Sequence, residues 1–253
     1  KDLFDDEDIA LIQSEYDSLV NNLIKCNKPE DRALIDKAFR IANNAHMNFR
    51  RKSGEPYIIH PISVAKIVNQ EIGLGARSIA TALLHDIVED TDYTIEDVER
   101  DFGPKIASLI DGLTKISDTY DKSSSASMQA ENFRKMLLTI SDDLRVILIK
   151  IADRLHNMRT LDSMPENKKM KIAGETIFLY APLANRIGLY AIKSELEDLS
   201  FKFRHPVLFD EIASKLKHSE KKYYALINKF SLPIIQKLTE ADLNFEINGR
   251  PKS

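Results

Sequence analysis

The apolar segment at 146–152 constrains the fold of this chain more than any other feature. Its residues are apolar on nearly all sides of a helix, so we expect a helix from about 142 to 161 that is buried in the protein. The chain has 253 residues with only eight Gly, nine Pro and no Trp, which favours helices over sheet. The sequence therefore predicts an all-α helical bundle with additional helices toward the C-terminus.

The expected buried helix carries three polar residues at helical spacing. Asp153, Asn157 and Thr160 stand at positions i, i+4 and i+7, so they lie on one face. A carboxylate on a buried helix needs a compensating partner, because charged side chains are rarely buried alone. An ion pair with an arginine and coordination of a metal ion both meet this need, and we favour a metal ligand.

An apolar segment leads into a dense acidic cluster in the helix that we expect from about 76 to 90. In one continuous helix, His85 and Glu89 lie on one face. Asp86 and Asp90 share a face in the same way. Three carboxylates this close repel one another, and a divalent cation offsets their charge. Taken alone, the cluster fits a solvated helix end as well as a metal site.

A basic loop precedes a further candidate ligand. Gly54 and Pro56 predict a loop over 49–57, which holds the densest basic cluster in the first half of the chain. A solvated helix C-terminus is one interpretation, since cations favour that end of the helix dipole. A site for an anion or phosphate is the other. His60 follows directly, before Pro61, which can begin a helix. Considered alone, His60 fits a structural role better than a ligand role.

Charge and composition limit the partners of this chain. A formal net charge of −3 gives no global argument for nucleic-acid or membrane binding, so an anionic ligand needs a local basic patch. No apolar run reaches the roughly 18 residues of a membrane span. The single Cys26 excludes an internal disulfide and fits a reducing cytoplasm. The Ser-rich segment 118–127 predicts a mobile loop.

Four candidate metal ligands occur in a recognisable order along the chain. Two imidazoles and two carboxylates form a mixed nitrogen and oxygen set that suits Mn, Fe or Zn. Their order, H…HD…D, resembles the HD superfamily of metal-dependent phosphohydrolases. Longer segments resemble the hydrolase domain of the long RelA/SpoT homologues, the stringent-response enzymes that make and degrade ppGpp and pppGpp. These segments are 51–61, 82–91, 129–136, 151–161, 180–184 and 195–201.

The resemblance implies a metal-dependent 3′-pyrophosphohydrolase that converts ppGpp or pppGpp to GDP or GTP and pyrophosphate. It implies that Glu89 and Asp90 orient or deprotonate the attacking water. The His-Asp and Glu-Asp pairs both stand in place, so a competent hydrolase is expected. The implied ligands of an Mn²⁺ ion are His60, His85, Asp86 and Asp153. The implied nucleotide contacts are Arg51, Lys52 and Ser53, with Tyr57, Asn157 and Thr160 near the ribose and phosphates.

We expect three parts in the chain: an N-terminal helical segment over 1–28, the hydrolase domain over 29–203, and a helical linker over 204–253. The end of the linker, at 247–253, resembles the opening of a synthetase domain, so we expect a fragment of a longer protein. The implied partner is a guanosine nucleotide, with no membrane and no direct nucleic-acid contact. Ribosome association or regulation by other domains stays open for the full-length protein.

Two other classes of function stay open. One is a different HD phosphohydrolase that acts on deoxynucleotides or cyclic dinucleotides, although the segments at 51–57 and 129–136 argue against it. The other is a regulatory helical module that binds a nucleotide without turnover. The intact candidate ligands argue against such a module, and a metal assay separates it from an enzyme.

Overall fold

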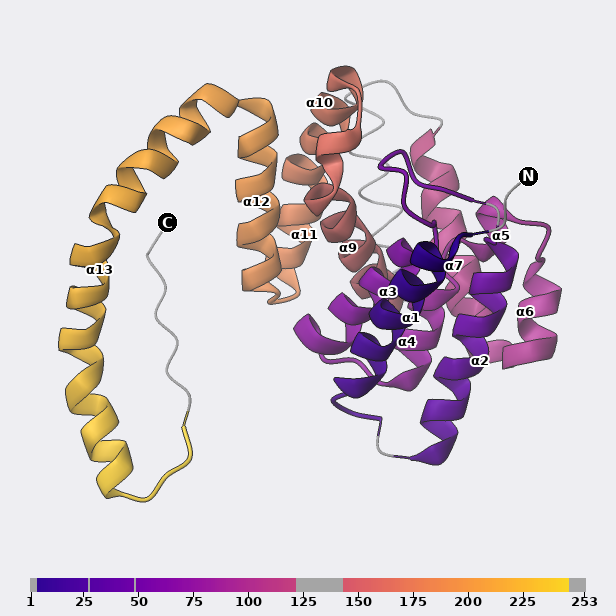
Figure 1. Ribbon diagram of the computed structural model, residues 1–253, viewed down its shortest axis with the longest axis horizontal. Coiled ribbons are helices and arrows are strands. Elements are labelled where there is room, and N and C mark those ends of the chain that lie inside the picture. The colour runs from indigo at the N-terminus through magenta and orange to yellow at the C-terminus, as the bar shows by residue number, and fades with distance from the viewer. Residues whose placement is uncertain (1–3, 27, 48, 122–142, 246–253) are drawn as a thin grey trace. The chain divides into compact units, whose positions relative to one another are not determined.

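The computed structural model describes residues 4–26, 28–47, 49–121 and 143–245. These residues contain helices and connecting turns but no strand, apart from one isolated antiparallel bridge between Arg50 and Pro56. The all-α prediction is confirmed (Figure 1). Over the same described ranges, no helix combines the length and apolar character that a membrane span requires.

The chain divides into two compact units, Lys1–Ser200 and Phe201–Ser253. The second unit contains one long helix, α13 (Pro206–Glu240). The first unit holds the other helices, of which α12 continues a few residues past its end. In chain order these are α1 (Asp6–Asn21), α2 (Pro29–Ala45), α3 (Ile59–Lys66), the π-helical η1 (Ile67–Glu71), α4 (Ala76–Leu83), α5 (Ile87–Asp90), α6 (Ile95–Phe102), α7 (Pro104–Asp121), α9 (Leu144–Arg159), the 3-10 turn η2 (Leu161–Ser163), α10 (Glu166–Glu175), the π-helical η3 (Thr176–Tyr180), α11 (Ala181–Arg186) and α12 (Tyr190–Arg204).

Helix α9 lies at the centre of the first unit. It packs against α3, α4 and α7, which come from distant parts of the chain (Figure 1). Ile147, Ile149, Ile151 and Leu155 have no exposed surface. The helix begins after Asp143, whose side chain accepts a hydrogen bond from the Arg145 amide at the N-terminus. The prediction of a buried helix in this region is confirmed.

The expected continuous helix over 76–90 is wrong, because α4 ends at Leu83 and α5 begins only at Ile87. The His85 imidazole causes part of this break: its Nδ1 donates to the carbonyl oxygen of Ala82 at 2.8 Å. In a continuous helix that carbonyl would accept from the backbone amide of Asp86. His85 and Asp86 therefore sit in a turn between two helices, and Asp86 caps α5, where its carbonyl oxygen accepts from the Asp90 amide at 2.9 Å.

Two other boundaries differ from the prediction. Helix α7 continues to Asp121, so residues 118–121 of the expected loop are helical. The rest of that loop and the helix expected near 128–141 lie outside the described residues. A kink or helix end is expected at Pro182, but α10 ends earlier, at Glu175, and Pro182 stands in the first turn of α11, which follows the π-helical turn η3. Such a turn widens the helix locally and accommodates a residue that lacks a backbone N–H.

Candidate metal centre

Four side chains from three parts of the first unit converge inside the helical bundle. His60 comes from α3, His85 and Asp86 come from the turn after α4, and Asp153 comes from α9. His60 Nε2 lies 3.3 Å from Asp153 Oδ1 and 3.7 Å from Asp86 Oδ2. His85 Nε2 lies 2.9 Å from Asp86 Oδ2 and 3.8 Å from Asp153 Oδ1. Two nitrogens and two oxygens therefore surround one point.

The spacing of these atoms fits a divalent metal ion. A first-row cation holds nitrogen and oxygen ligands at about 2.0–2.2 Å, which places neighbouring ligand atoms roughly 3.0–3.5 Å apart. The Nε2 atom of His85 is buried and has no hydrogen-bond partner, although Asp86 Oδ2 lies 2.9 Å from it. Its Nδ1 already donates to Ala82, so in the neutral imidazole Nε2 carries the lone pair that a metal needs. His60, His85 and Asp153 thus form a buried metal site.

The pKa values of the candidate ligands reflect the same arrangement of side chains. Burial opposes protonation of His85, yet the carboxylates of Asp86 and Asp153 raise its pKa to about 9. Burial also opposes ionisation of the two carboxyl groups. The imidazoles, together with Lys150 beside Asp153, nevertheless hold both carboxyl pKa values well below their usual range. A proton on His85 therefore occupies the position that a cation would take.

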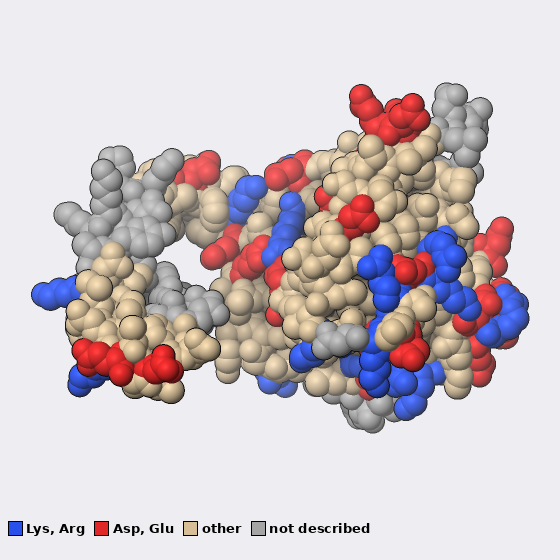
Figure 2. Space-filling view, turned by 60° about the horizontal axis from the view of Figure 1, so that its bottom comes forward, with Lys and Arg blue, Asp and Glu red and all other residues tan. Residues whose placement is uncertain are grey.

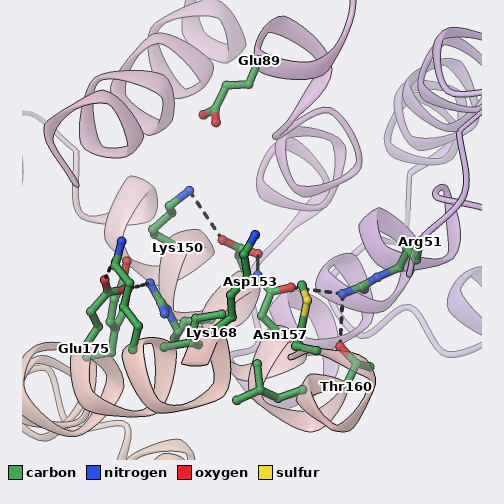
Figure 3. A pocket seen from close by; sticks show the side chains of 14 residues that line it. Arg51, Glu89, Lys150, Asp153, Asn157, Thr160, Lys168 and Glu175 are labelled. Carbon is green, nitrogen blue, oxygen red and sulfur yellow. Dashed lines mark hydrogen bonds and ion pairs between the residues drawn. The ribbon is translucent and has the colours of Figure 1, made fainter. Parts of the chain in front are cut away.

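Further side chains hold the ligands in place. The Tyr57 hydroxyl donates to Asp86 Oδ2 at 2.6 Å, and Asn157 Nδ2 donates to Asp153 Oδ1 at 2.6 Å. Lys150 Nζ lies 3.5 Å from Asp153 Oδ2 (Figure 3). Such outer partners orient ligands and tune metal affinity. Tyr57, which we expected near the ribose and phosphates, directs its hydroxyl at a candidate ligand, and its contact with a nucleotide stays a prediction.

A cavity of about 440 Å³ opens beside Asp153. Five cationic side chains line it, against the three acidic side chains of Glu89, Asp153 and Glu175. On the face drawn in Figure 2, basic and acidic side chains lie side by side. Figure 3 shows the Glu89 carboxylate directed toward the space beside Asp153. The cationic side chains are Arg51, Lys150, Arg154, Lys168 and Lys171.

The structure brings together three of the predicted nucleotide contacts. One terminal nitrogen of Arg51 donates to Asn157 Oδ1 at 3.2 Å and to Thr160 Oγ1 at 3.1 Å. The loop that carries Arg51 is tight, with Arg51 N donating to Glu55 O and with Gly54 at φ +96°. A left-handed φ of this kind favours glycine. Arg51 thus reaches from the basic loop to the Asn157 and Thr160 face of α9.

The other predicted residues lie at the margin of the site. Lys52 and Ser53 are exposed at the tip of the basic loop and are not among the residues that line the cavity. Glu89 and Asp90, at the end of α5, are both exposed, and of the two only Glu89 lines the cavity. Nucleotide binding by Lys52 and Ser53, and the role of Asp90, stay predictions.

The comparison that identifies the family agrees with this geometry. Residues 38–190 match the family model described as the HD domain. The chain belongs to the HD-domain family. The match begins in α2, includes all four candidate ligands and ends at the first residue of α12.

Comparison with individual relatives narrows the assignment within the HD-domain family. A GTP pyrophosphokinase of Myxococcus xanthus is 47% identical over 225 residues, which are 88% of this chain and 30% of the relative. A guanosine-3′,5′-bis(diphosphate) 3′-pyrophosphohydrolase of Aquifex aeolicus is 42% identical over 225 residues, 88% of this chain and 32% of the relative. The expected likeness to RelA/SpoT-type proteins is confirmed, and the chain spans about a third of the length of these relatives.

A solved structure agrees with this assignment. It is described as a metazoan orthologue of SpoT that hydrolyses ppGpp and plays a role in starvation responses. It superposes with a TM-score of 0.53 at 26% identity, and the match covers 68% of this chain and 96% of that chain. The matched region therefore includes nearly all of the metazoan chain but only part of this one.

Two residues at the site, Lys150 and His156, are not among those predicted from the sequence. Lys150 lies beside Asp153 with its side chain 12% exposed, and a lone Lys within the apolar segment 146–152 was the available signal. His156 lies next to His60, with 2.7 Å between their Nδ1 atoms. Burial, with His60 and Arg51 beside it, lowers the pKa of His156 to about 3, so this imidazole is neutral. The sequence feature that could have indicated His156 is its position three residues after Asp153, near the same helix face.

Proposed function

We propose that this HD domain is a metal-dependent 3′-pyrophosphohydrolase that converts ppGpp and pppGpp to GDP and GTP with release of pyrophosphate. The observation that carries the proposal is the buried His60, His85 and Asp153 site beside a cavity with a cationic lining. The names of the relatives include both a pyrophosphokinase and a pyrophosphohydrolase. A mixed imidazole and carboxylate metal site supports the hydrolytic activity, because water is the nucleophile that such sites commonly activate.

The four candidate ligands would hold the metal, and we propose Mn²⁺ as the ion. Imidazole and carboxylate ligands suit Mn²⁺, and the set contains no thiolate. When bound, the ion would supply acidification of water and Lewis-acid stabilisation of charge at phosphorus. Asp86 and Asp153 supply the negative charge that offsets the cation, and Tyr57 and Asn157 hold those carboxylates in position.

Glu89 is the proposed general base. Its carboxylate faces the cavity beside Asp153, where it would accept a proton from the attacking water (Figure 3). Positioned general bases typically accelerate a reaction by about 10²–10⁴-fold. Asp90 would help to orient that water from the end of α5.

The cationic groups bind the nucleotide in this proposal. Arg51, with Asn157 and Thr160, would contact the ribose and phosphates, and Lys52 and Ser53 would close over the nucleotide from the exposed tip of the loop. A substrate with two pyrophosphate groups needs partners beyond one metal ion, and the cationic lining of the cavity meets that need. We place this reaction in the cytoplasm, which fits the single Cys26.

The test is incubation of the chain with ppGpp, with and without Mn²⁺, followed by measurement of pyrophosphate and GDP. We expect both products in equal amounts only when Mn²⁺ is present, and none after chelation. Parallel reactions with dGTP and a cyclic dinucleotide test the alternative of another HD phosphohydrolase. Binding of ppGpp without any turnover in Mn²⁺ would contradict the proposal and support a regulatory module.

A further inference from the structure

The outer ring nitrogen of His60 contacts a second histidine inside the bundle. His60 Nδ1 and His156 Nδ1 are 2.7 Å apart, and both side chains are buried. His60 comes from α3 and His156 comes from α9, so the contact joins two of the helices that supply the metal ligands. One of the two nitrogens must carry the proton that they share, because a hydrogen bond needs one donor and one acceptor.

Arg51 decides which nitrogen carries that proton. Its guanidinium NH1 lies 3.1 Å from the same His156 Nδ1. A guanidinium has only donors, so His156 Nδ1 must be an acceptor toward Arg51. The proton between the imidazoles therefore belongs to His60 Nδ1, which donates to His156. His60 Nε2 then carries a lone pair, and this is the atom 3.3 Å from Asp153 Oδ1 and 3.7 Å from Asp86 Oδ2.

The opposite arrangement of protons would disable the centre. A proton on His156 Nδ1 would point at the N–H groups of Arg51, and His156 would donate to His60 Nδ1. The neutral His60 would then carry its proton on Nε2, where it would block coordination. The outer hydrogen bond of a metal-ligating histidine commonly selects its tautomer in this way.

We propose that His156, with its own tautomer selected by Arg51, is a positioning residue that keeps His60 Nε2 available to the metal. The proposal rests on the metal site of the proposed function and not on the identity of the substrate. It gives Arg51 a second task, because the guanidinium expected to meet the nucleotide also selects the tautomer of a metal ligand.

The test compares two substitutions of similar size, His156→Asn and His156→Leu, in the whole chain. Asn places a carbonyl oxygen near the position of Nδ1 and can accept from His60, whereas Leu cannot. Loss of a residue that hydrogen-bonds a metal ligand typically weakens metal binding by about 10–100-fold. We expect His156→Leu to lose Mn²⁺ affinity in this range, with His156→Asn within about threefold of the original protein. Met158→Leu is the matched control, since Met158 is fully buried on the same helix.

The affinity is read by titration of Mn²⁺ with detection of the free ion by electron paramagnetic resonance, without nucleotide. Unchanged affinity in His156→Leu would overturn the proposal. Equal losses in His156→Leu and His156→Asn would also overturn it, because the shape of the imidazole and not its acceptor would then matter. A protein with the expected affinities that leaves ppGpp intact would contradict the proposed function alone.

A second measurement uses the original protein and requires no substitution. Nitrogen-15 spectra of the histidine-labelled chain report which ring nitrogen of each imidazole is protonated. We expect His60 to be protonated at Nδ1 and His156 to be unprotonated at Nδ1, in the metal-free protein and in the protein loaded with diamagnetic Zn²⁺. A protonated His156 Nδ1 would overturn the proposal.

Discussion

The metal centre and the basic loop at 49–57 differ in how far their polar side chains are exposed to solvent. His60, His85 and Asp153 are 4%, 1% and 8% exposed, and each has a partner that orients it. Lys52 and Ser53, at the tip of the loop, are exposed to solvent. Burial makes an unpaired charge costly, so the centre is held in one geometry, whereas exposed loop residues can adjust to a ligand at little cost. The comparison predicts large effects of substitution in the centre and graded effects along the loop.

The largest effect should come from Asp153→Ala. The change removes a metal ligand and also removes the carboxylate that lies 3.5 Å from Lys150 Nζ. We expect Mn²⁺ content near zero and a fall in hydrolysis of about 1,000-fold or more, because metal stabilisation of the transition state is worth several kcal/mol. Metal analysis of the purified variant checks this, and thermal unfolding separates ligand loss from misfolding. Full Mn²⁺ occupancy in the folded variant would show that Asp153 is not a ligand.

The combined change Glu89→Gln with Asp90→Asn should separate catalysis from metal binding. We expect kcat for ppGpp to fall by about 10²–10⁴-fold while Mn²⁺ affinity stays close to the original, since only the proton acceptor is removed. Parallel metal titrations and steady-state kinetics give the two numbers. A collapse of Mn²⁺ affinity together with kcat would instead identify these residues as ligands.

Metal binding should depend on pH through His85. Its pKa of about 9 means that most molecules of the metal-free protein hold a proton there at pH 7, which Mn²⁺ must displace. The apparent affinity should therefore rise up to about tenfold per pH unit above pH 7 and level off near pH 9. Calorimetric titrations in buffers of different ionisation enthalpy count the released protons. Binding without proton release would show that His85 is already neutral.

The same pKa shift affects the stability of the metal-free protein. The pKa of His85 is raised from 6.5 when folded, so protonation stabilises the folded state. This contribution is fully present below pH 6.5 and is lost as the pH rises through about 9. Chemical unfolding of metal-free protein at pH 7 and pH 9 should show the lower stability at pH 9, and saturating Mn²⁺ should abolish most of that difference, because His85 is neutral when it binds the ion.

Arg51 lies between the two regions and should give an intermediate effect. Arg51→Ala should raise KM for ppGpp by roughly tenfold, because a hydrogen bond to a charged group is worth about 1.5–3 kcal/mol. Arg51→Lys should recover only part of this loss, since Lys lacks the planar fork that reaches Asn157 and Thr160 together. Kinetics at saturating Mn²⁺ measure KM apart from metal loss. A KM equal to that of the original protein in both variants would make the basic cluster a solvated surface.

Lys52→Ala should give the smallest effect. An exposed cation contributes about 0–1 kcal/mol, so KM should rise by no more than about fivefold. The increase should shrink with added salt, because exposed charges are screened. Measurement of KM at two ionic strengths checks both statements. A loss equal to that of Arg51→Ala would show that the loop tip becomes buried around the nucleotide.

Features that depend on local periodicity could be predicted from the amino-acid sequence. The apolar segment at 146–152 predicts the buried helix α9, and the spacing of Asp153, Asn157 and Thr160 predicts their common face, because helix geometry relates residues three and four apart. Thr94 and Asp97, which stand three residues apart, form the capping box of α6. The order of the four candidate ligands and the longer motifs identified the family before any geometry was known.

Only the tertiary structure decided how these pieces meet. At the break between α4 and α5 the imidazole of His85 donates to the Ala82 carbonyl, and the helical pattern contains no sign of this contact. The contacts of His156 with Arg51 and His60 join residues separated by 105 and 96 positions. No local spacing encodes such contacts, since they require α3 to pack against α9 and the basic loop to lie over the same helix. The protonation pattern at His60 is therefore a property of the packed bundle and not of any one segment.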